Sequence, residues 1–209
     1  MNIDGLLEII KKRRHNGRVK ADPVPDEALR KIIEAASWSP SGNNAQPWEF
    51  VVITDPGLKA KIRETMEHPA PAGGPGHGEA PVDPPVIIVV CGDTRIKESY
   101  PENVNREEVF YSSMAACVQN LHLAAAACGL ATNWGTVREG SMGQLGKILA
   151  LPEGIEIIAM VRLGYPQQSP PPKSRRSFEE TTHWNGFDRA KLRDVRKFIE
   201  SYGKGWGKL

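Results

Sequence analysis

A ten-residue segment of the chain reads Ser39-Pro40-Ser41-Gly42-Asn43-Asn44-Ala45-Gln46-Pro47-Trp48. It follows an amphipathic helical pattern and precedes an extended apolar run, so it connects two regular elements. Two prolines restrict its backbone, and its hydroxyl and amide side chains offer hydrogen bonds to a flat polar ligand. The same residue types also build ordinary tight connections. Taken alone, the segment predicts a rigid loop, and further motifs must decide between a ligand site and a plain turn.

The apolar residues on both sides of this loop recur with helical spacing. Two segments place apolar residues on one face and predict surface helices with one buried stripe: Ile3, Leu6, Leu7 and Ile10, then Leu29, Ile32, Ile33 and Ala36. The segment of about 107–128 is more apolar and rich in alanine, so we expect a helix that is buried on most sides. Its small side chains allow a second helix to approach, either from the same chain or across a dimer axis. Two more helices are predicted at 141–150 and near 188–202.

Strand patterns are interspersed among these helices. Branched residues bounded by Pro, Gly or Asp predict strands at 50–53, 86–91 and 155–163, with a shorter one at 131–134. The order of elements is mixed and does not alternate regularly between strand and helix. We therefore predict an α+β fold in which helices surround a small sheet, and not a doubly wound nucleotide-binding fold.

Composition narrows the class of protein. The 209 residues are enough for one domain with a sizeable core. With 27 basic and 25 acidic residues the net charge is only +2, which disfavours nucleic acid as a partner. The sequence has neither a signal-peptide pattern nor an apolar run of membrane-spanning length, so we expect a cytoplasmic protein without a membrane partner. Cys91, Cys117 and Cys128 lack metal-ligand spacing and predict buried free thiols.

A proline- and glycine-rich segment interrupts the regular patterns at about 67–85. Its composition excludes a helix or a central strand. A functional lid and a disordered loop are both compatible with such a segment. His68 and His77 within it have no second ligand at metal-binding spacing, so we expect solvent-exposed side chains and no metal site.

Two basic clusters flank the predicted domain. The first is Lys11-Lys12-Arg13-Arg14-His15, which continues through Asn16-Gly17-Arg18, and the second is Lys173-Ser174-Arg175-Arg176 after Gly164-Tyr165-Pro166. Basic residues at a helix end interact favourably with the helix dipole, and charge runs are normally solvated. Each cluster alone therefore predicts an exposed surface.

Together, these motifs resemble the nitroreductase family of FMN-dependent oxidoreductases in the correct order along nearly the whole chain. Arg13 to Arg18 is similar to the family's basic start, 22–27 to the following step, and Ser39 to Trp48 to its Ser-Pro-Ser-x-x-Asn-x-Gln-Pro-Trp loop. The helix around 119–130 resembles the family's central helix, and the second basic cluster resembles its closing phosphate-binding segment. The resemblance implies the nitroreductase-like fold as an intertwined homodimer.

The resemblance also implies which residues hold FMN. Arg13, Lys173 and Arg175 are expected at the phosphate, since guanidinium groups make planar, charge-assisted bonds to phosphate oxygens. Arg14 and His15 are expected beside the ribityl chain and the ring. The partner subunit would contribute Pro40, Ser41, Gly42 and Asn44, whereas Trp134, Gly135 and Thr136 would pass near flavin N5, Gly135 because it permits close backbone approach.

Two positions depart from the family pattern. His15 stands where the family has Ser, and Gly17 stands where the family has a basic residue near flavin N1 and the C2 carbonyl. A positive charge there stabilises the reduced ring, so its loss changes the redox potential unless Arg18 replaces it. A hydrogen-bonding or packing role for His15 is favoured over acid–base catalysis, because the cofactor carries the chemistry and no residue is assigned as catalytic.

The function implied is ping-pong electron transfer from NADPH or NADH, as transient donor, through FMN to a small-molecule acceptor such as a nitroaromatic or a quinone. The choice between the two nicotinamides and the natural acceptor stay open. Alternatives are another flavin reaction on the same fold, such as dehalogenation or flavin fragmentation, a non-enzymatic FMN-binding protein, and a structural dimer with basic patches.

Overall fold

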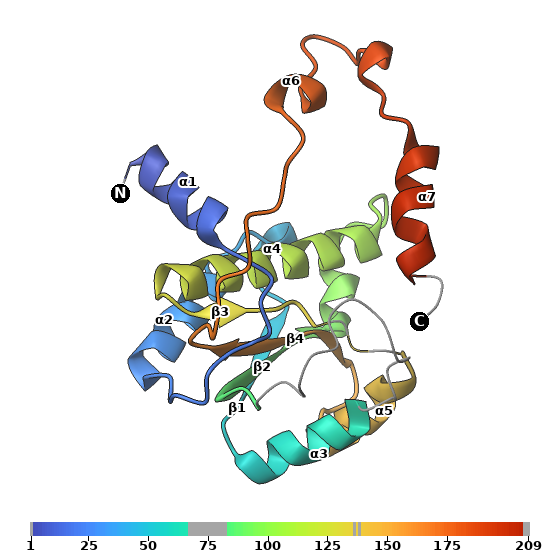
Figure 1. Cartoon of the computed structure of the whole chain (residues 1–209). Coiled ribbons are helices and arrows are strands. Elements are labelled where there is room, and N and C mark those ends of the chain that lie inside the picture. Colours follow the sequence, from blue (N-terminus) through green and yellow to red (C-terminus); the bar gives the residue numbers. More distant parts are fainter. Residues whose placement is uncertain (1, 67–82, 136, 138, 207–209) are drawn as a thin grey trace. The chain divides into compact units, whose positions relative to one another are not determined.

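The computed structural model describes residues 2–66, 83–135, 137 and 139–206 (Figure 1). The chain forms two compact units. The first comprises Met1–Glu67 and Pro81–Pro170, and the second contains the C-terminal segment from 171 onward. The predicted lid at about 67–85, with His68 and His77, lies outside the described residues except for its last three positions, and so does Thr136.

A four-stranded antiparallel sheet lies at the centre of the first unit. Its strands are β1 (Trp48–Ile53), β2 (Val86–Asp93), β3 (Ala131–Thr132) and β4 (Ile155–Gly164), in the order β1-β2-β4-β3. The central β2 is buried along almost its whole length, as a strand covered on both faces must be. All four strands were predicted, and the α+β class is confirmed.

Helices cover both faces of this sheet. They are α2 (Asp26–Ser37) and α4 (Arg106–Ala127) on one face, and α3 (Pro56–Met66) and α5 (Glu139–Ile148) on the other (Figure 1). Because side chains alternate along a strand, Ile88 and Val90 pack towards α2 and α4, whereas Val89 and Cys91 pack towards α3 and α5. Two apolar clusters result, one on each side of the sheet.

Helix α3 was not predicted from the sequence. Its apolar residues form no clear stripe, but its start carries a local signal. Asp55 accepts a hydrogen bond from the Leu58 amide at 2.6 Å, and Pro56 occupies the first helical position. An Asp N-cap followed by Pro is a common helix start, so the signal was present but not used.

The N-terminal helix α1 (Ile3–Lys12) corrects another expectation. Its apolar stripe was predicted to be buried, yet none of its residues is buried in the single chain, and Ile3 is 65% exposed. Leu6, Leu7 and Ile10 share that exposed face. The amphipathic pattern predicted the helix correctly but could not say whether the described part of the chain covers its stripe.

Two of the three cysteines are buried as expected. Burial raises the pKa of the Cys91 thiol to about 11 and that of Cys117 to about 12, which keeps both thiols protonated and unreactive. Cys128 is exposed instead of buried, because it caps the C-terminal end of α4. Within the described residues no helix is both long and apolar enough to cross a membrane.

The second unit carries short α6 (Phe178–Thr181) and α7 (Val195–Trp206). Helix α7 begins later than predicted, because 189–191 form a separate 3-10 turn capped by Asp188. Its apolar side chains Val195, Phe198 and Ile199 are exposed within the described residues.

Candidate functional site

The segment that follows α1 is fixed against the sheet edge. His15 pairs with Thr132 of β3 in a parallel bridge, and the Asn16 amide donates to the Thr132 carbonyl at 2.8 Å. The buried Asn16 side chain donates to the Gln168 carbonyl at 2.8 Å and accepts from the Arg18 amide at 3.0 Å. These bonds set the direction in which the neighbouring basic side chains leave the backbone.

Arg13 and Arg14 form a group of donors without an acidic partner. Both side chains are half-buried, and no ion pair found among the described residues involves either of them. One Arg14 nitrogen, Nη1, donates to the carbonyls of Lys11 and Arg13, whereas Nε is buried without any partner. A buried donor left unpaired is costly and uncommon, so this group is suited to an anionic, acceptor-rich ligand.

A small cavity opens beside these arginines. It measures about 150 Å³ and is lined by Lys12, Arg13, Arg14, Asn16 and Thr132 together with the C-terminal end of α4. Three cations and no acidic residue in this lining make it a candidate anion site.

His15 lies next to this group and is predisposed to be neutral. Partial burial and then the charge of Arg13 lower the pKa of its imidazole. Its Nδ1 accepts a hydrogen bond from the Trp134 amide at 3.3 Å, which requires an unprotonated Nδ1. His15 thus has the hydrogen-bonding role expected from the sequence.

In the turn after β3, the structure gives Gly135 a different reason for being glycine from the close approach to flavin that the sequence analysis expected. Its amide donates to the Met160 carbonyl at 3.0 Å, and its carbonyl accepts from the Met160 amide at 2.9 Å. A Cβ at this position would lie 2.6 Å from the Met160 oxygen. The close backbone approach that requires glycine is therefore to β4, and the Gly135 amide is already engaged. Gly17 packs beside Asn133, where a Cβ would have ordinary contact at 3.7 Å.

The loop of Ser39 to Trp48 contains a short 3-10 turn, Gly42–Asn44. Its backbone is strained, because Asn43, Asn44 and Gln46 all have positive φ, at 52°, 53° and 49°. Left-handed conformations cost energy for residues other than glycine and concentrate at functional sites. Ser41 Oγ accepts from the Gln46 amide at 3.0 Å and holds the turn closed. The exposed Asn44 side chain has no partner among the described residues.

Gly42 is required by packing. A Cβ would lie 2.3 Å from Val109 Cγ1 and 3.0 Å from Tyr100 Cε1, and the Gly42 amide donates to Ser113 Oγ at 3.2 Å.

We expect Gly42→Ala to lower the free energy of unfolding by about 1–3 kcal/mol through overpacking. Gly143→Ala is the matched control, because Gly143 lies in α5 and no atom is within 4 Å of the new methyl group. This variant should raise the free energy of unfolding by about 0.5–1 kcal/mol. Urea unfolding followed by circular dichroism checks both, and equal stability of Gly42→Ala and wild type would contradict this packing.

The loop and the arginines lie at different ends of α4. Pro40, Ser41 and Gly42 line a cavity of about 390 Å³ with Ser113 and its neighbours in the N-terminal half of that helix, whereas the arginine cavity contacts Ala126 near its C-terminus. From residue 113 to 126 the helix rises about 20 Å at 1.5 Å per residue. Neither of these two cavities is lined by both groups. Lys173 and Arg175 belong to the second unit, where both are exposed and Arg175 Nη1 donates to the Ser174 carbonyl at 2.9 Å.

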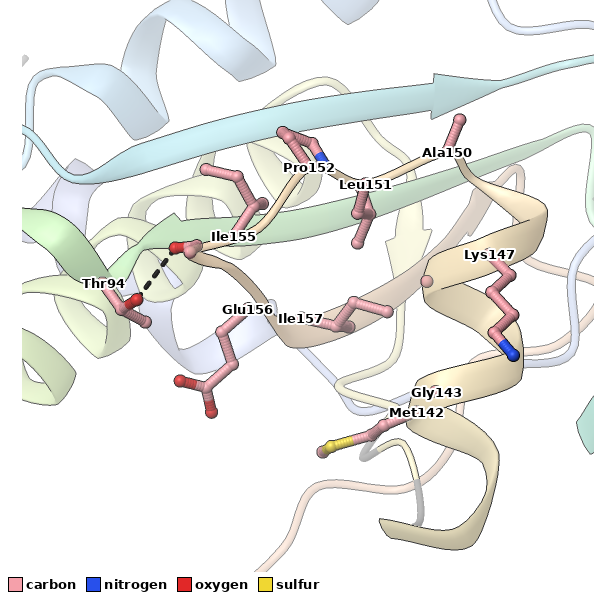
Figure 2. Close-up of a pocket in the computed structure, with 12 residues that line it drawn as sticks. Thr94, Met142, Gly143, Lys147, Ala150, Leu151, Pro152, Ile155, Glu156 and Ile157 are labelled. Carbon is pink, nitrogen blue, oxygen red and sulfur yellow. Dashed lines mark hydrogen bonds between the residues drawn. The ribbon is translucent and has the colours of Figure 1, made fainter.

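Another cavity, of about 520 Å³, lies between α5 and the start of β4 (Figure 2). Thr94 closes one side by donating from Oγ1 to the Gly154 carbonyl at 2.9 Å, and Lys147 and Glu156 add charges at the rim. None of the site residues predicted from the sequence lines it.

Comparison with known proteins agrees with the family resemblance of the sequence motifs. Residues 10–165 match the model of the nitroreductase family. The chain belongs to the nitroreductase family. The predicted resemblance is thereby confirmed for most of its length.

Two relatives and one solved structure are similar to this nitroreductase-family chain. An NADH dehydrogenase of Thermus thermophilus is 32% identical over 198 residues, covering 83% of this chain and 92% of that protein. An iodotyrosine deiodinase of Haliscomenobacter hydrossis is 30% identical over 163 residues, covering 69% and 72%. The crystal structure of an oxidized iodotyrosine deiodinase bound to FMN and 3-iodo-L-tyrosine has a TM-score of 0.69 at 23% identity, covering 87% of this chain and 100% of that one. The last likeness concerns the fold alone.

The structure places two further residues beside the arginine group that sequence reasoning did not assign to the site. His122 of α4 is only 4% exposed, and its Nδ1 lies 2.7 Å from Oγ1 of Thr132. The signal for it was a single imidazole within the otherwise apolar run of 121–127. Thr132 connects three elements, since it also pairs with β4 through Leu163 and with the segment of His15.

Proposed function

We propose that this chain is an FMN-dependent NAD(P)H oxidoreductase that reduces flat electrophilic acceptors such as nitroaromatics or quinones. Family membership and the relative named NADH dehydrogenase support the class of reaction. The observation that carries the proposal is the group of Arg13 and Arg14, whose donors have no acidic partner among the described residues and include the buried, unpaired Nε.

These residues fit the FMN phosphate. Its oxygens accept charge-assisted hydrogen bonds, and Arg13 and the Arg14 Nε offer donors of that kind beside a cavity of suitable charge. Lys173 and Arg175 are proposed to add two more cations. When bound, FMN supplies hydride acceptance from the nicotinamide at N5 and electron delivery to the acceptor.

The remaining proposed contacts bind and orient the cofactor. Neutral His15 holds the Trp134 amide in place, so the turn after β3 keeps its position beside the cofactor. The neighbouring Gly17 brings no charge towards the ring, and Arg18 is the exposed cation next to it. If Arg18 does not reach the ring, one positive charge fewer stabilises the reduced flavin near N1. The redox potential should then make the flavin harder to reduce.

The loop of Pro40, Ser41, Gly42 and Asn44 is proposed to serve the cofactor of a partner subunit. Its separation from the arginines along α4 supports this arrangement, because one chain does not bring both groups to either of the two cavities. The uncovered apolar face of α1 and the 80% exposed Trp38 beside the loop add surface that association would bury. The assembly proposed is a homodimer with two FMN sites, each completed by both subunits.

A charge on the exposed face of α1 tests the dimer. Leu6→Glu should leave the chain folded, because α1 contributes no buried residue, but it should shift sedimentation towards monomer and release FMN. Lys11→Gln changes the net charge by the same amount on the polar side and should leave the dimer intact. A Leu6→Glu variant that stays dimeric and keeps its flavin would exclude α1 from the interface.

A visible spectrum and an anaerobic titration test the function. The purified protein should be yellow, and its visible flavin absorbance should bleach with NADPH or NADH and return when a nitroaromatic is added. A colourless protein that takes up no FMN would overturn the proposal. Bound flavin that neither nicotinamide reduces would favour a storage protein.

A second candidate function is reductive dehalogenation. The relative named iodotyrosine deiodinase favours it, at 30% identity over more than two thirds of both chains. The reaction would replace a carbon–halogen bond with carbon–hydrogen, using two electrons from the reduced flavin and a proton, and release halide. Halide release from a halotyrosine, without steady NAD(P)H consumption by nitroaromatics, would favour this alternative.

A further inference from the structure

One buried polar atom near the arginines has no partner. His122 Nε2 is inaccessible to solvent and has no hydrogen-bond partner among the described residues, although His122 Nδ1 is bonded to Thr132. Buried polar atoms are paired in the large majority of cases, and each exception needs a physical reason. The function proposed above does not use His122.

The hydrogen bond to Thr132 decides which nitrogen carries the proton. The Thr132 hydroxyl is buried, and His122 Nδ1 is the only partner recorded for it in the described part of the chain. If the hydroxyl donates to Nδ1, a single group, the Nε2–H, is left unpaired. If Nδ1–H donates instead, both the hydroxyl hydrogen and the Nε2 lone pair are left unpaired. The first arrangement satisfies more groups, so Nε2 is a hydrogen-bond donor.

His122 lies beside the arginine cavity. Its partner Thr132 lines that cavity, and so does Ala126, which lies one turn further along the same face of α4. Arg13 and His15 are close enough for their charges to contribute to the lowered pKa of His122. The cavity beside His122 is lined by three cations and by no acidic side chain, so an acceptor-rich ligand would complement it.

The Trp134 ring lies beside His122 and is partly open to solvent. Its ring centroid lies 5.9 Å from that of His122, and its side chain is partly open to solvent at 37% exposure. The indole N–H has no protein acceptor among the described residues. No hydrogen bond recorded in the described part of the chain fixes this ring, so a ligand that displaces it would break none of these bonds.

We propose that His122 is a cofactor-positioning residue, whose Nε2–H, oriented by Thr132, donates a hydrogen bond to an acceptor atom of the bound FMN. This inference rests on the proposed function. It adds a hydrogen-bond donor from α4 to the part of the proposed FMN site that Arg13, Arg14 and His15 form in the same subunit. It also explains why an imidazole stands in an apolar helix.

The double variant His122→Leu with Thr132→Val tests this role in the full chain. Replacing both partners with apolar groups removes the pair without leaving a new orphan. FMN affinity, measured by quenching of flavin fluorescence on the apoprotein, should fall roughly 5- to 150-fold, the range of a lost hydrogen bond. The thermal midpoint of the apoprotein should stay equal or rise, because the unpaired donor is gone.

Single variants distinguish a role of His122 Nε2 in FMN binding from a role of His122 Nδ1. His122→Gln keeps an N–H donor near the position of Nε2 and should bind FMN more tightly than His122→Asn, whose amide reaches only the position of Nδ1. Wild-type affinity in the double variant overturns the role, as does weaker binding together with a lowered apoprotein midpoint, which marks a packing residue. Equal affinities of the Gln and Asn variants also overturn it. A wild-type chain that takes up no FMN overturns the proposed function itself.

Discussion

Arg13→Ala is expected to weaken FMN binding roughly 10- to 150-fold, which corresponds to the loss of a charged hydrogen bond of about 1.5–3 kcal/mol. The reason is that Arg13 is half-buried beside the arginine cavity and has no ion-pair partner among the described residues. Its loss removes donors to the phosphate without breaking any recorded side-chain contact. Fluorescence titration of the apoprotein with FMN measures the change.

Lys11→Ala is the matched control for this variant. Lys11 is a basic residue in the last turn of the helix that Arg13 caps, but it is exposed and does not line the cavity. It should change FMN affinity by less than about threefold, the size of a screened surface effect. If the two variants lose affinity equally, general electrostatic attraction and not a specific contact holds the phosphate.

Acidification is expected to cost the FMN-free protein about 3 kcal/mol of stability through His122 alone. Burial, followed by the charges of Arg13 and His15, lowers the pKa of His122 from 6.5 to about 4. The unfolded chain takes up a proton near pH 6.5, whereas the folded chain does so only near pH 4. Stability is therefore full above 6.5 and falls as the pH drops from 6.5 towards 4, by about 1.4 kcal/mol per pH unit.

The comparison that isolates His122 uses the double variant His122→Leu with Thr132→Val. Carboxylates and His15 titrate in both proteins, so the difference between the two stability curves reports His122. Urea unfolding at several pH values should show wild type losing stability relative to the variant below pH 6.5. Parallel curves would mean that the imidazole is as easily protonated in the folded protein as in the unfolded chain.

The sequence predicted the regular elements well where apolar periodicity is strong. All four strands and helices α1, α2, α4 and α5 were found from the spacing or the density of their apolar residues. Helix α3 was missed, since its start depends on Asp55 and Pro56 and not on a stripe. The apolar face of α1 was misassigned as buried, because periodicity marks an apolar face without saying which surface covers it.

The site was predictable only in part. Motif order placed Arg13, Arg14 and His15 together, and the structure fixes that segment against Thr132. The engagement of Gly135 with Met160 and the pairing of His122 with Thr132 depend on contacts between residues distant in sequence. No local pattern encodes such contacts, so these roles emerge only from the fold.

Each FMN site is proposed to combine arginines of one subunit with the loop of the other, and subunit complementation tests this arrangement directly. One parent carries Arg13→Ala. The other carries Asn44→Gly, which removes the amide yet tolerates the positive φ of 53°. Each parent binds FMN weakly on its own. In a heterodimer of the two, one site has both defects and the other has none.

The measurement is the fraction of tight FMN sites after the two variants are unfolded and refolded together in equal amounts. About one quarter of all sites should regain wild-type affinity. About half of the dimers are mixed, and each mixed dimer holds one intact site. If loop and arginines of the same chain formed each site, every site would keep one defect. A refolded mixture with no tight sites would contradict the account.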